Sequence, residues 1–217
     1  MTIAKTLIQD GALVRQVTQG DILAGGETIN ATLTTAGAGT ILGSQLTAGI
    51  LSRSGPGGAF NDTTDTAANI IAAMLGGLGN TGIQNGTTMR LSYINTVAFA
   101  MTLVAGTGVT LGSNVNCAAS SVKDYLITVT NGTPTSVQVC NTTNASAVVT
   151  GMTQAQTSQL SVGQLVSGTG ISGGTTVLSI QSGTGVTLSA NATATNVTVA
   201  LTFNPTVTIN SLGQKLL

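Results

Sequence analysis

The sequence predicts a mainly β fold, with a β-sandwich or barrel-like domain that carries one short α-helix and a β-rich accessory module. Three observations support this prediction. Short runs of alternating apolar and polar residues recur along the chain, Gly, Asn and Ser separate them, and a single segment shows helical spacing. With 217 residues, the chain is long enough for one large β domain or two small ones.

Residues 1–30 are predicted to form an N-terminal arm. The segment contains apolar pairs such as Leu7 and Ile8, then a Gly-rich turn, which together indicate a short strand with turns. Isolated segments of this kind are seldom ordered alone, so we expect the arm to dock on a neighbour. Asp10 and Arg15 interrupt its apolar stretch, and for that reason we expect no cleaved signal peptide.

A β core domain is predicted for residues 31–141. Its helix is expected at about 65–75, where polar residues precede Ala and Ile at helical spacing and Gly76 follows. The strands on either side alternate apolar and polar residues, as half-buried strands require. These predicted strands are 31–35, 40–42, 46–53, 89–93 and 97–103.

A hairpin is predicted to close this core. Tyr125–Val129 and Val137–Val139 both alternate, and Asn131–Gly132 lies between them; Asn-Gly is a strong hairpin signal because both residues tolerate positive φ. In this hairpin Cys140 would lie opposite Tyr125 and not opposite Cys117. We therefore expect two free, partly buried thiols.

Residues 142–203 are predicted to be a β-rich accessory module, and 204–217 a C-terminal strand and tail. The module contains only short strands and turn residues and has no charged side chain. The hexapeptide Gly-Thr-Gly-Val-Thr-Leu occurs at 106–111 and again at 183–188, so both parts share a strand-entry motif. One repetition is too little to indicate a solenoid.

The composition argues against an enzyme. There is no His, and the chain has only six acidic and six basic residues, 6% of the total. His is the side chain best suited to gain or lose a proton near neutral pH. A Lys could act as a base only if it were desolvated beside a Ser, and Ser120–Lys123 is better explained as a turn that enters a strand. We expect no catalytic residues.

The sequence also gives no sign of a metal or cofactor site. Asp62 and Asp65 could offer oxygen ligands to Ca²⁺, but their spacing does not match an EF-hand loop, and an N-cap role accounts for them. The Gly-rich segment 54–58 lacks the Gly-Lys-Ser/Thr of a phosphate loop and is interpreted as a connecting loop. We expect no metal site and no cofactor.

Charge and hydropathy also limit the partners. The formal net charge is zero and the basic residues are dispersed, so nucleic-acid binding is not expected. No uncharged apolar run of about 18 residues occurs, so a membrane span is not expected either. A weakly charged, Thr-rich surface indicates self-association. The dispersed bases are Lys5, Arg15, Arg53, Arg90, Lys123 and Lys215.

The order of four segments resembles small structural proteins of tailed bacteriophages. These segments are an Arg-ended strand at 50–53, an acidic, Thr-rich cap with an Ala-rich helix at 61–74, a strand at 90–96, and 101–111, which ends in Ala-Gly-Thr-Gly-Val-Thr-Leu. Residues 122–140 look like the closing hairpin of those proteins. Residues 160–188, which begin Leu-Ser-Val-Gly-Gln-Leu-Val-Ser-Gly-Thr-Gly-Ile, are similar to modules of phage tail, fibre and surface proteins.

This resemblance, which covers about residues 31–203, is to capsid decoration proteins, also called cement or head-fibre proteins. It implies a non-enzymatic virion component, made in the cytoplasm of the bacterial host, that binds the major capsid protein shell. The protein would sit as a homotrimer on the exterior of the head and stabilise it. The arm at 1–30 would contact the shell or a neighbouring copy, and the module at 142–203 would face outward.

A second hypothesis is a tail-fibre or spike module that recognises a host-surface glycan. The uncharged segment 142–203 is an addition to the pattern of the smaller decoration proteins, so a protruding fibre remains an alternative to a compact cement subunit. Carbohydrate sites usually offer aromatic faces, and the five aromatic rings of this chain mostly occupy core positions in the predicted strands. A depolymerase would need paired carboxylates, which the six dispersed acids do not suggest.

Overall fold

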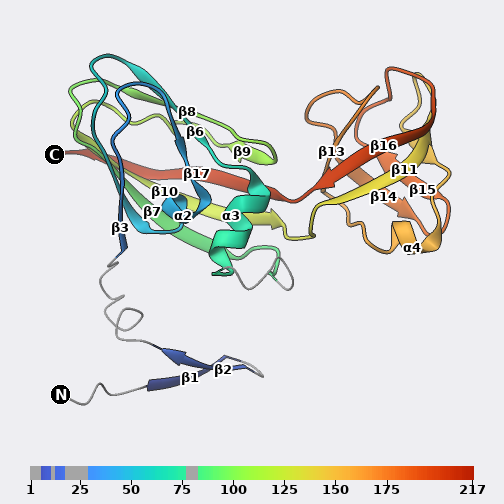
Figure 1. Cartoon of the computed structure of the whole chain (residues 1–217), viewed down its shortest axis with the longest axis horizontal. Helices are drawn as coiled ribbons and strands as arrows, with labels where there is room; N and C mark the ends of the chain where they lie inside the picture. The colour runs from blue at the N-terminus through green and yellow to red at the C-terminus, as the bar shows by residue number, and fades with distance from the viewer. Residues whose placement is uncertain (1–5, 11–12, 18–28, 77–82) are drawn as a thin grey trace.

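The computed structural model describes residues 6–10, 13–17, 29–76 and 83–217. This part of the chain is mainly β, as predicted, and its residues form several sheets and three short helices. Two hydrophobic cores divide it into a first unit and a module (Figure 1). Most of the predicted arm, 1–30, lies outside the described residues; within it β1 (Thr6–Asp10) and β2 (Leu13–Val17) pair as an antiparallel hairpin.

The first unit is a sandwich of a six-stranded and a three-stranded sheet. The larger sheet has the order β3-β5-β7-β10-β17-β9 and the smaller one β4-β6-β8. Its elements are β3 (Ile29–Leu33), β4 (Gly39–Ile41), α2 (Gly43–Leu46), β5 (Gly49–Arg53), β6 (Phe60–Thr64), α3 (Ala67–Met74), β7 (Thr88–Asn95), β8 (Met101–Val104), β9 (Val109–Leu111), β10 (Ser121–Asn131) and β17 (Thr206–Leu216).

The chain alternates between the two sheets as it runs from β3 to β8. β3, β5 and β7 are parallel neighbours in the large sheet, and β4, β6 and β8 are parallel neighbours in the small one. Each turn of the chain therefore adds one strand to the large sheet and one strand to the small sheet, beside the strands of the previous turn. Leu51, Phe60, Leu91 and Leu103 fill the space between the sheets.

The predicted helix at about 65–75 is confirmed as α3. The Thr66 hydroxyl accepts a hydrogen bond from the Asn69 backbone N–H at 3.3 Å, which is the expected N-cap contact. Ile70 and Ile71 are fully buried against the first core. Gly76, at φ +61°, follows the last turn and ends the helix in the left-handed conformation.

Two short helical turns were not predicted. α2 occupies the start of the predicted strand 46–53, so β5 begins only at Gly49. α4 (Gln154–Thr157) has Thr153 and Gln156 in a capping box. Such single turns are too short to show an apolar periodicity of their own.

The predicted hairpin around Asn131–Gly132 is wrong. β10 lies between β7 and β17 and is antiparallel to both, whereas β11 (Ser136–Thr142) pairs with β16 and β12 in the module. Between β7 and β17 the eleven-residue β10 has partners along both edges, which a short hairpin with β11 would not provide. The boundary between the units thus falls in the connection 132–135.

The module is a small barrel of six strands. Its sheet has the order β13-β16-β11-β12-β15-β14, and the Val166 N–H donates to the Thr175 carbonyl at 2.8 Å, so β13 meets the start of β14 and the sheet closes. Its core includes Val149, Val186 and Phe203. Besides β11, the strands of the module are β12 (Val148–Thr150), β13 (Leu165–Ser167), β14 (Val177–Gln181), β15 (Gly185–Leu188) and β16 (Asn196–Asn204).

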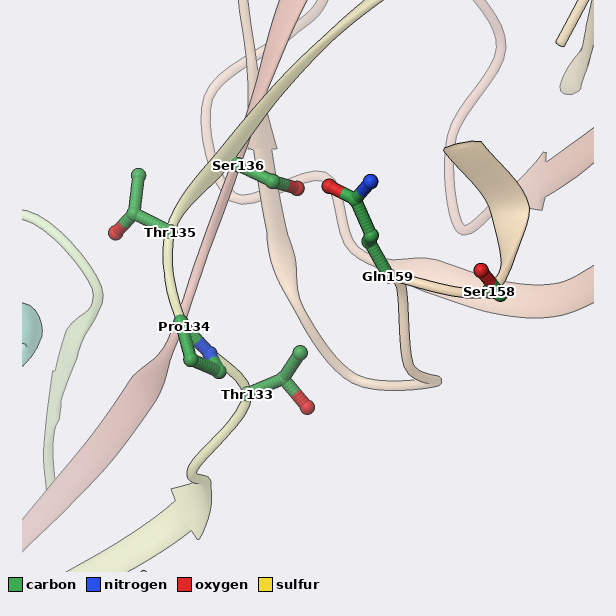
Figure 2. Close-up of a pocket in the computed structure, with 6 residues that line it drawn as sticks. All are labelled: Thr133, Pro134, Thr135, Ser136, Ser158 and Gln159. Carbon is green, nitrogen blue, oxygen red and sulfur yellow. The ribbon is translucent and has the colours of Figure 1, made fainter. Parts of the chain in front are cut away.

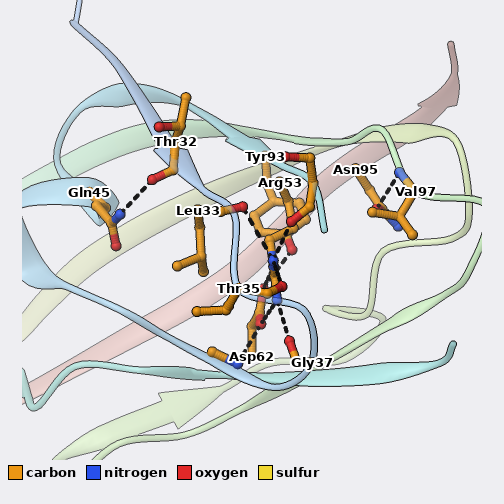
Figure 3. Close-up of polar contacts among 12 residues, drawn as sticks. Thr32, Leu33, Thr35, Gly37, Gln45, Arg53, Asp62, Tyr93, Asn95 and Val97 are labelled. Carbon is orange, nitrogen blue, oxygen red and sulfur yellow. Dashed lines mark hydrogen bonds and ion pairs between the residues drawn. The ribbon is translucent and has the colours of Figure 1, made fainter. Parts of the chain in front are cut away.

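A buried ion pair joins the two sheets of the first unit (Figure 3). Arg53 Nε lies 2.8 Å from Asp62 Oδ2, and both side chains are fully buried. Asp62 also accepts hydrogen bonds from the Tyr93 hydroxyl at 2.8 Å and the Gly39 N–H at 3.0 Å. The guanidinium donates further to the backbone carbonyls of Leu33, Thr35, Gly37 and Ser54, and it lies 4.8 Å from the Phe60 ring centroid.

Substitution of Asp62 by Ala is expected to destabilise the first unit by about 3–5 kcal/mol, because it leaves the Arg53 guanidinium buried without its carboxylate. Urea unfolding followed by tyrosine fluorescence measures this directly. The chain has no Trp, and both tyrosines lie in the first core, so the signal reports on that unit.

Arg90→Ala is the matched control. The Arg90–Asp124 pair spans 3.0 Å, but the Arg90 side chain is 57% exposed, so its loss should cost less than about 1 kcal/mol. Equal effects of the two substitutions would contradict the role assigned to the buried pair.

Both cysteines are free, as predicted, but they are fully buried and not partly buried, and they lie in different cores. Burial raises the pKa of each thiol to about 11, and for Cys117 the nearby Lys123 offsets part of this increase. Cys140 lies opposite Val199 in β16, not opposite Tyr125, because β11 belongs to the module.

At pH 8 the native protein should therefore not react with a disulfide reagent such as Ellman's, whereas the urea-unfolded chain should titrate two thiols. In a Cys117→Ser variant the remaining thiol, Cys140, reports on unfolding of the module alone. Rapid modification of either thiol in the native state would show that its core opens readily.

Candidate interaction surface

The charged residues proposed as ligands or caps are engaged in structural contacts. Asp62 is not a helix cap, because it lies in β6 and is used by Arg53 and Tyr93. Asp65 lies just before the Thr66 cap, and its carboxylate accepts from the Gly43 N–H, the Thr66 N–H and the Asn69 amide. Burial raises the pKa of Asp65, but these three hydrogen bonds outweigh it and the pKa is lowered.

Other candidate groups are also accounted for by local structure. The Ser121 hydroxyl donates to the Ala119 carbonyl at 2.9 Å, and the predicted turn before Lys123 is present at the start of β10. The Gly-rich segment 54–58 connects β5 to β6, as predicted. Within the described ranges, no three His, Cys, Asp or Glu residues gather as metal ligands would.

Asn131 locks the connection between the two units. It is fully buried, and its amide nitrogen donates to the Ser161 hydroxyl and the Val162 carbonyl, both at 2.8 Å. Its amide oxygen accepts from the Thr133 N–H at 2.9 Å. The chain crosses the junction twice, from β10 to β11 and, through Pro205, from β16 to β17 (Figure 1). The junction is therefore held by two chain segments and a buried amide.

A shallow groove of about 360 Å³ lies beside this junction (Figure 2). Its lining offers hydroxyls and one amide but no charge and no aromatic ring. The Ser136 hydroxyl is buried and has no hydrogen-bond partner in the described part of the chain. It faces the Gln159 amide across the groove (Figure 2). The lining residues are Thr133, Pro134, Thr135, Ser136, Ser158 and Gln159.

The apolar alternation of β11 is directed outward. Val137 and Val139 are 61% and 50% exposed, whereas Gln138 and Cys140 between and after them are buried. Gln138 donates from its amide to the Gln159 side-chain oxygen at 3.2 Å, which satisfies it inside the module. Pairing with β16 in this register turns Cys140 into the core, and the two valines of the alternating run therefore face outward.

Two residues of β16 extend this surface. Val137 lies opposite Thr202, and Val139 lies opposite Ala200, on neighbouring antiparallel strands. Ala200 is exposed and Thr202 is half-buried. We call these four residues, Val137, Val139, Ala200 and Thr202, the valine face.

The surroundings of the valine face carry no ions. From Tyr125 to Gln214 the sequence contains no Asp, Glu, Lys or Arg, and this range includes every strand of the module. A surface without ionic groups loses little hydration when it is covered. Alternation in the sequence located the strand but not its orientation, so no sequence signal identified this surface.

Comparisons of the chain with protein-family models, with curated proteins and with solved structures find no match. Among the described residues, no helix is long and apolar enough to cross a bilayer.

We expect Asn131→Ala to weaken the junction. It removes the hydrogen bonds to Ser161, Val162 and Thr133 and should cost about 1–3 kcal/mol, because buried polar groups lose their partner. Limited proteolysis should then cleave the connection 132–135 faster than in the unsubstituted protein.

Thr135→Ala serves as the control in the same connection. Thr135 is exposed and makes one long contact, 3.4 Å from its hydroxyl to the Asn204 amide oxygen. Cleavage of the Asn131→Ala variant at the same rate as this control would show that the amide does not hold the units together.

Proposed function

We propose that this chain is a non-enzymatic structural protein of a tailed-bacteriophage virion, a decoration protein that binds the outer surface of the head and stabilises it as a homotrimer. The observation that carries the proposal is the uncharged module with outward valines, joined by a buried amide to a first unit that contains all seven charged residues of the range 31–217. Such a surface suits adhesion between proteins.

The proposed mechanism is stabilisation by binding. A protein that binds the assembled shell more strongly than separated subunits shifts the equilibrium toward the intact shell. A trimer multiplies a modest contact by about 100-fold or more when its subunits bind together. The resemblance of residues 31–203 to decoration proteins agrees with this role.

The N-terminal arm, residues 1–30, is the proposed contact with the shell or with a neighbouring copy. A two-stranded hairpin such as β1–β2 is marginally stable in isolation, so a neighbouring surface would stabilise it.

A host-recognition module of a tail fibre is the second candidate. The groove beside the junction favours it to the extent that hydroxyls and an amide can bind a neutral polyhydroxyl ligand. It offers no aromatic face for a sugar ring to stack on. We therefore rank adhesion to the shell first.

Purified phage heads lacking the protein test the proposal. The labelled full chain is expected to co-sediment with the heads and raise their resistance to heat, and a variant without residues 1–25 should lose most of its occupancy. Unchanged occupancy of that variant would exclude the arm as the shell contact. Labelling at the tail tip of intact virions, without labelling of the head, would instead support the fibre hypothesis.

A further inference from the structure

We infer that the valine face on β11 and β16 is the surface through which copies of this chain bind one another. The inference deepens the proposed function and rests on its homo-oligomeric part. The structure leads to it through orientation, backbone satisfaction and charge.

The orientation of β11 is the first argument. A strand with the pattern Val-Gln-Val-Cys gains most from burial of its valines, yet here Gln138 and Cys140 are inside and Val137 and Val139 are outside. The inward Gln138 is satisfied only because Gln159 meets it. Covering the two valines would remove from water apolar area that folding of the single chain leaves exposed on this face.

The backbone of β11 is already paired on both sides, and this limits how a partner can bind. β11 has β16 on one side and β12 on the other, so it is not an open sheet edge that would pair with an added strand. The partner must therefore contact side chains and pack on the face of the sheet. Packing of sheet faces through their side chains is a common arrangement of β-sheets.

The absence of charged residues around the valine face limits which surface can cover it. A charged protein surface that covered the valine face would bury its ions without counter-ions, since none occur from Tyr125 to Gln214. The matching surface is uncharged and offers small apolar and hydroxyl groups. The valine faces of neighbouring copies supply both, and in a closed trimer three such faces meet around the three-fold axis.

The contact is tested with the full-length chain by sedimentation equilibrium. Val139→Lys places a charge at the centre of the face, and we expect it to weaken self-association at least about 100-fold, because an ammonium group covered without a counter-ion is strongly unfavourable. Val139 is half-exposed in the single chain, so the fold should tolerate Lys. Circular dichroism and protection of the Cys140 thiol verify that the module remains folded.

Leu178→Lys is the matched control. Leu178 is 56% exposed and belongs to β14, which is separated from β11 by β12 and β15 in the sheet order. It receives the same charge on a similarly exposed apolar side chain of the same module. Association of this variant should equal that of the unsubstituted protein.

The outcomes separate this inference from the proposed function. Association lost in Val139→Lys and kept in Leu178→Lys supports the valine face as the contact. An oligomer that persists in Val139→Lys, or a monomeric unsubstituted chain, overturns the inference, whether or not the chain binds heads. If Val139→Lys lowers head occupancy without affecting association, the face contacts the shell instead, which also overturns it. Failure of an oligomeric chain to bind heads would count against the proposed function alone.

Discussion

The ion pair between Arg53 and Asp62 is the interaction on which the first unit depends. Asp62 lies in β6, Arg53 ends β5, and the Tyr93 hydroxyl reaches the carboxylate from β7. The guanidinium also binds carbonyls after β3, and the carboxylate binds the first N–H of β4. Five successive strands therefore meet at one site. A different arrangement of these strands would separate the two charges and leave them buried without a counter-ion, which is strongly unfavourable.

The module is organised without ions. Its interior polar side chains are amides and hydroxyls, and some of them pair with each other, as Gln138 does with Gln159 and as Thr142 does with Asn196. Asn131 uses the same chemistry to fix the module to the first unit. In the described part of the chain the two units thus differ in surface chemistry, with the surface ion pair Arg90–Asp124 on the first unit and a neutral surface on the second.

Part of the fold could be predicted because local signals were strong. The helix was located from the polar residues before it, its Ile pair and Gly76, although the cap is Thr66 and not Asp62 or Asp65. The strand β10 was located from the alternation of Tyr125, Ile127 and Val129, all of which are buried. The repeated hexapeptide does enter a strand in both places, β9 and β15. Its geometry differs, however. In the first copy Gly108 has a positive φ, whereas in the second copy Gly183 has one. The strands also differ, since β9 is a parallel edge strand and β15 lies between two antiparallel partners.

The sequence by itself determined which residues favour strands, where the helix begins and ends, and how little charge the chain carries. Those properties depend on side chains a few positions apart. Tertiary structure alone decided that β10 pairs with β17 and not with β11, that Asn131 locks a junction and does not turn a hairpin, and that Val137 and Val139 point outward. Strand partners and the direction of a strand's two sides are set by contacts between residues far apart in the sequence, such as Cys140 with Val199, and local periodicity carries no information about them.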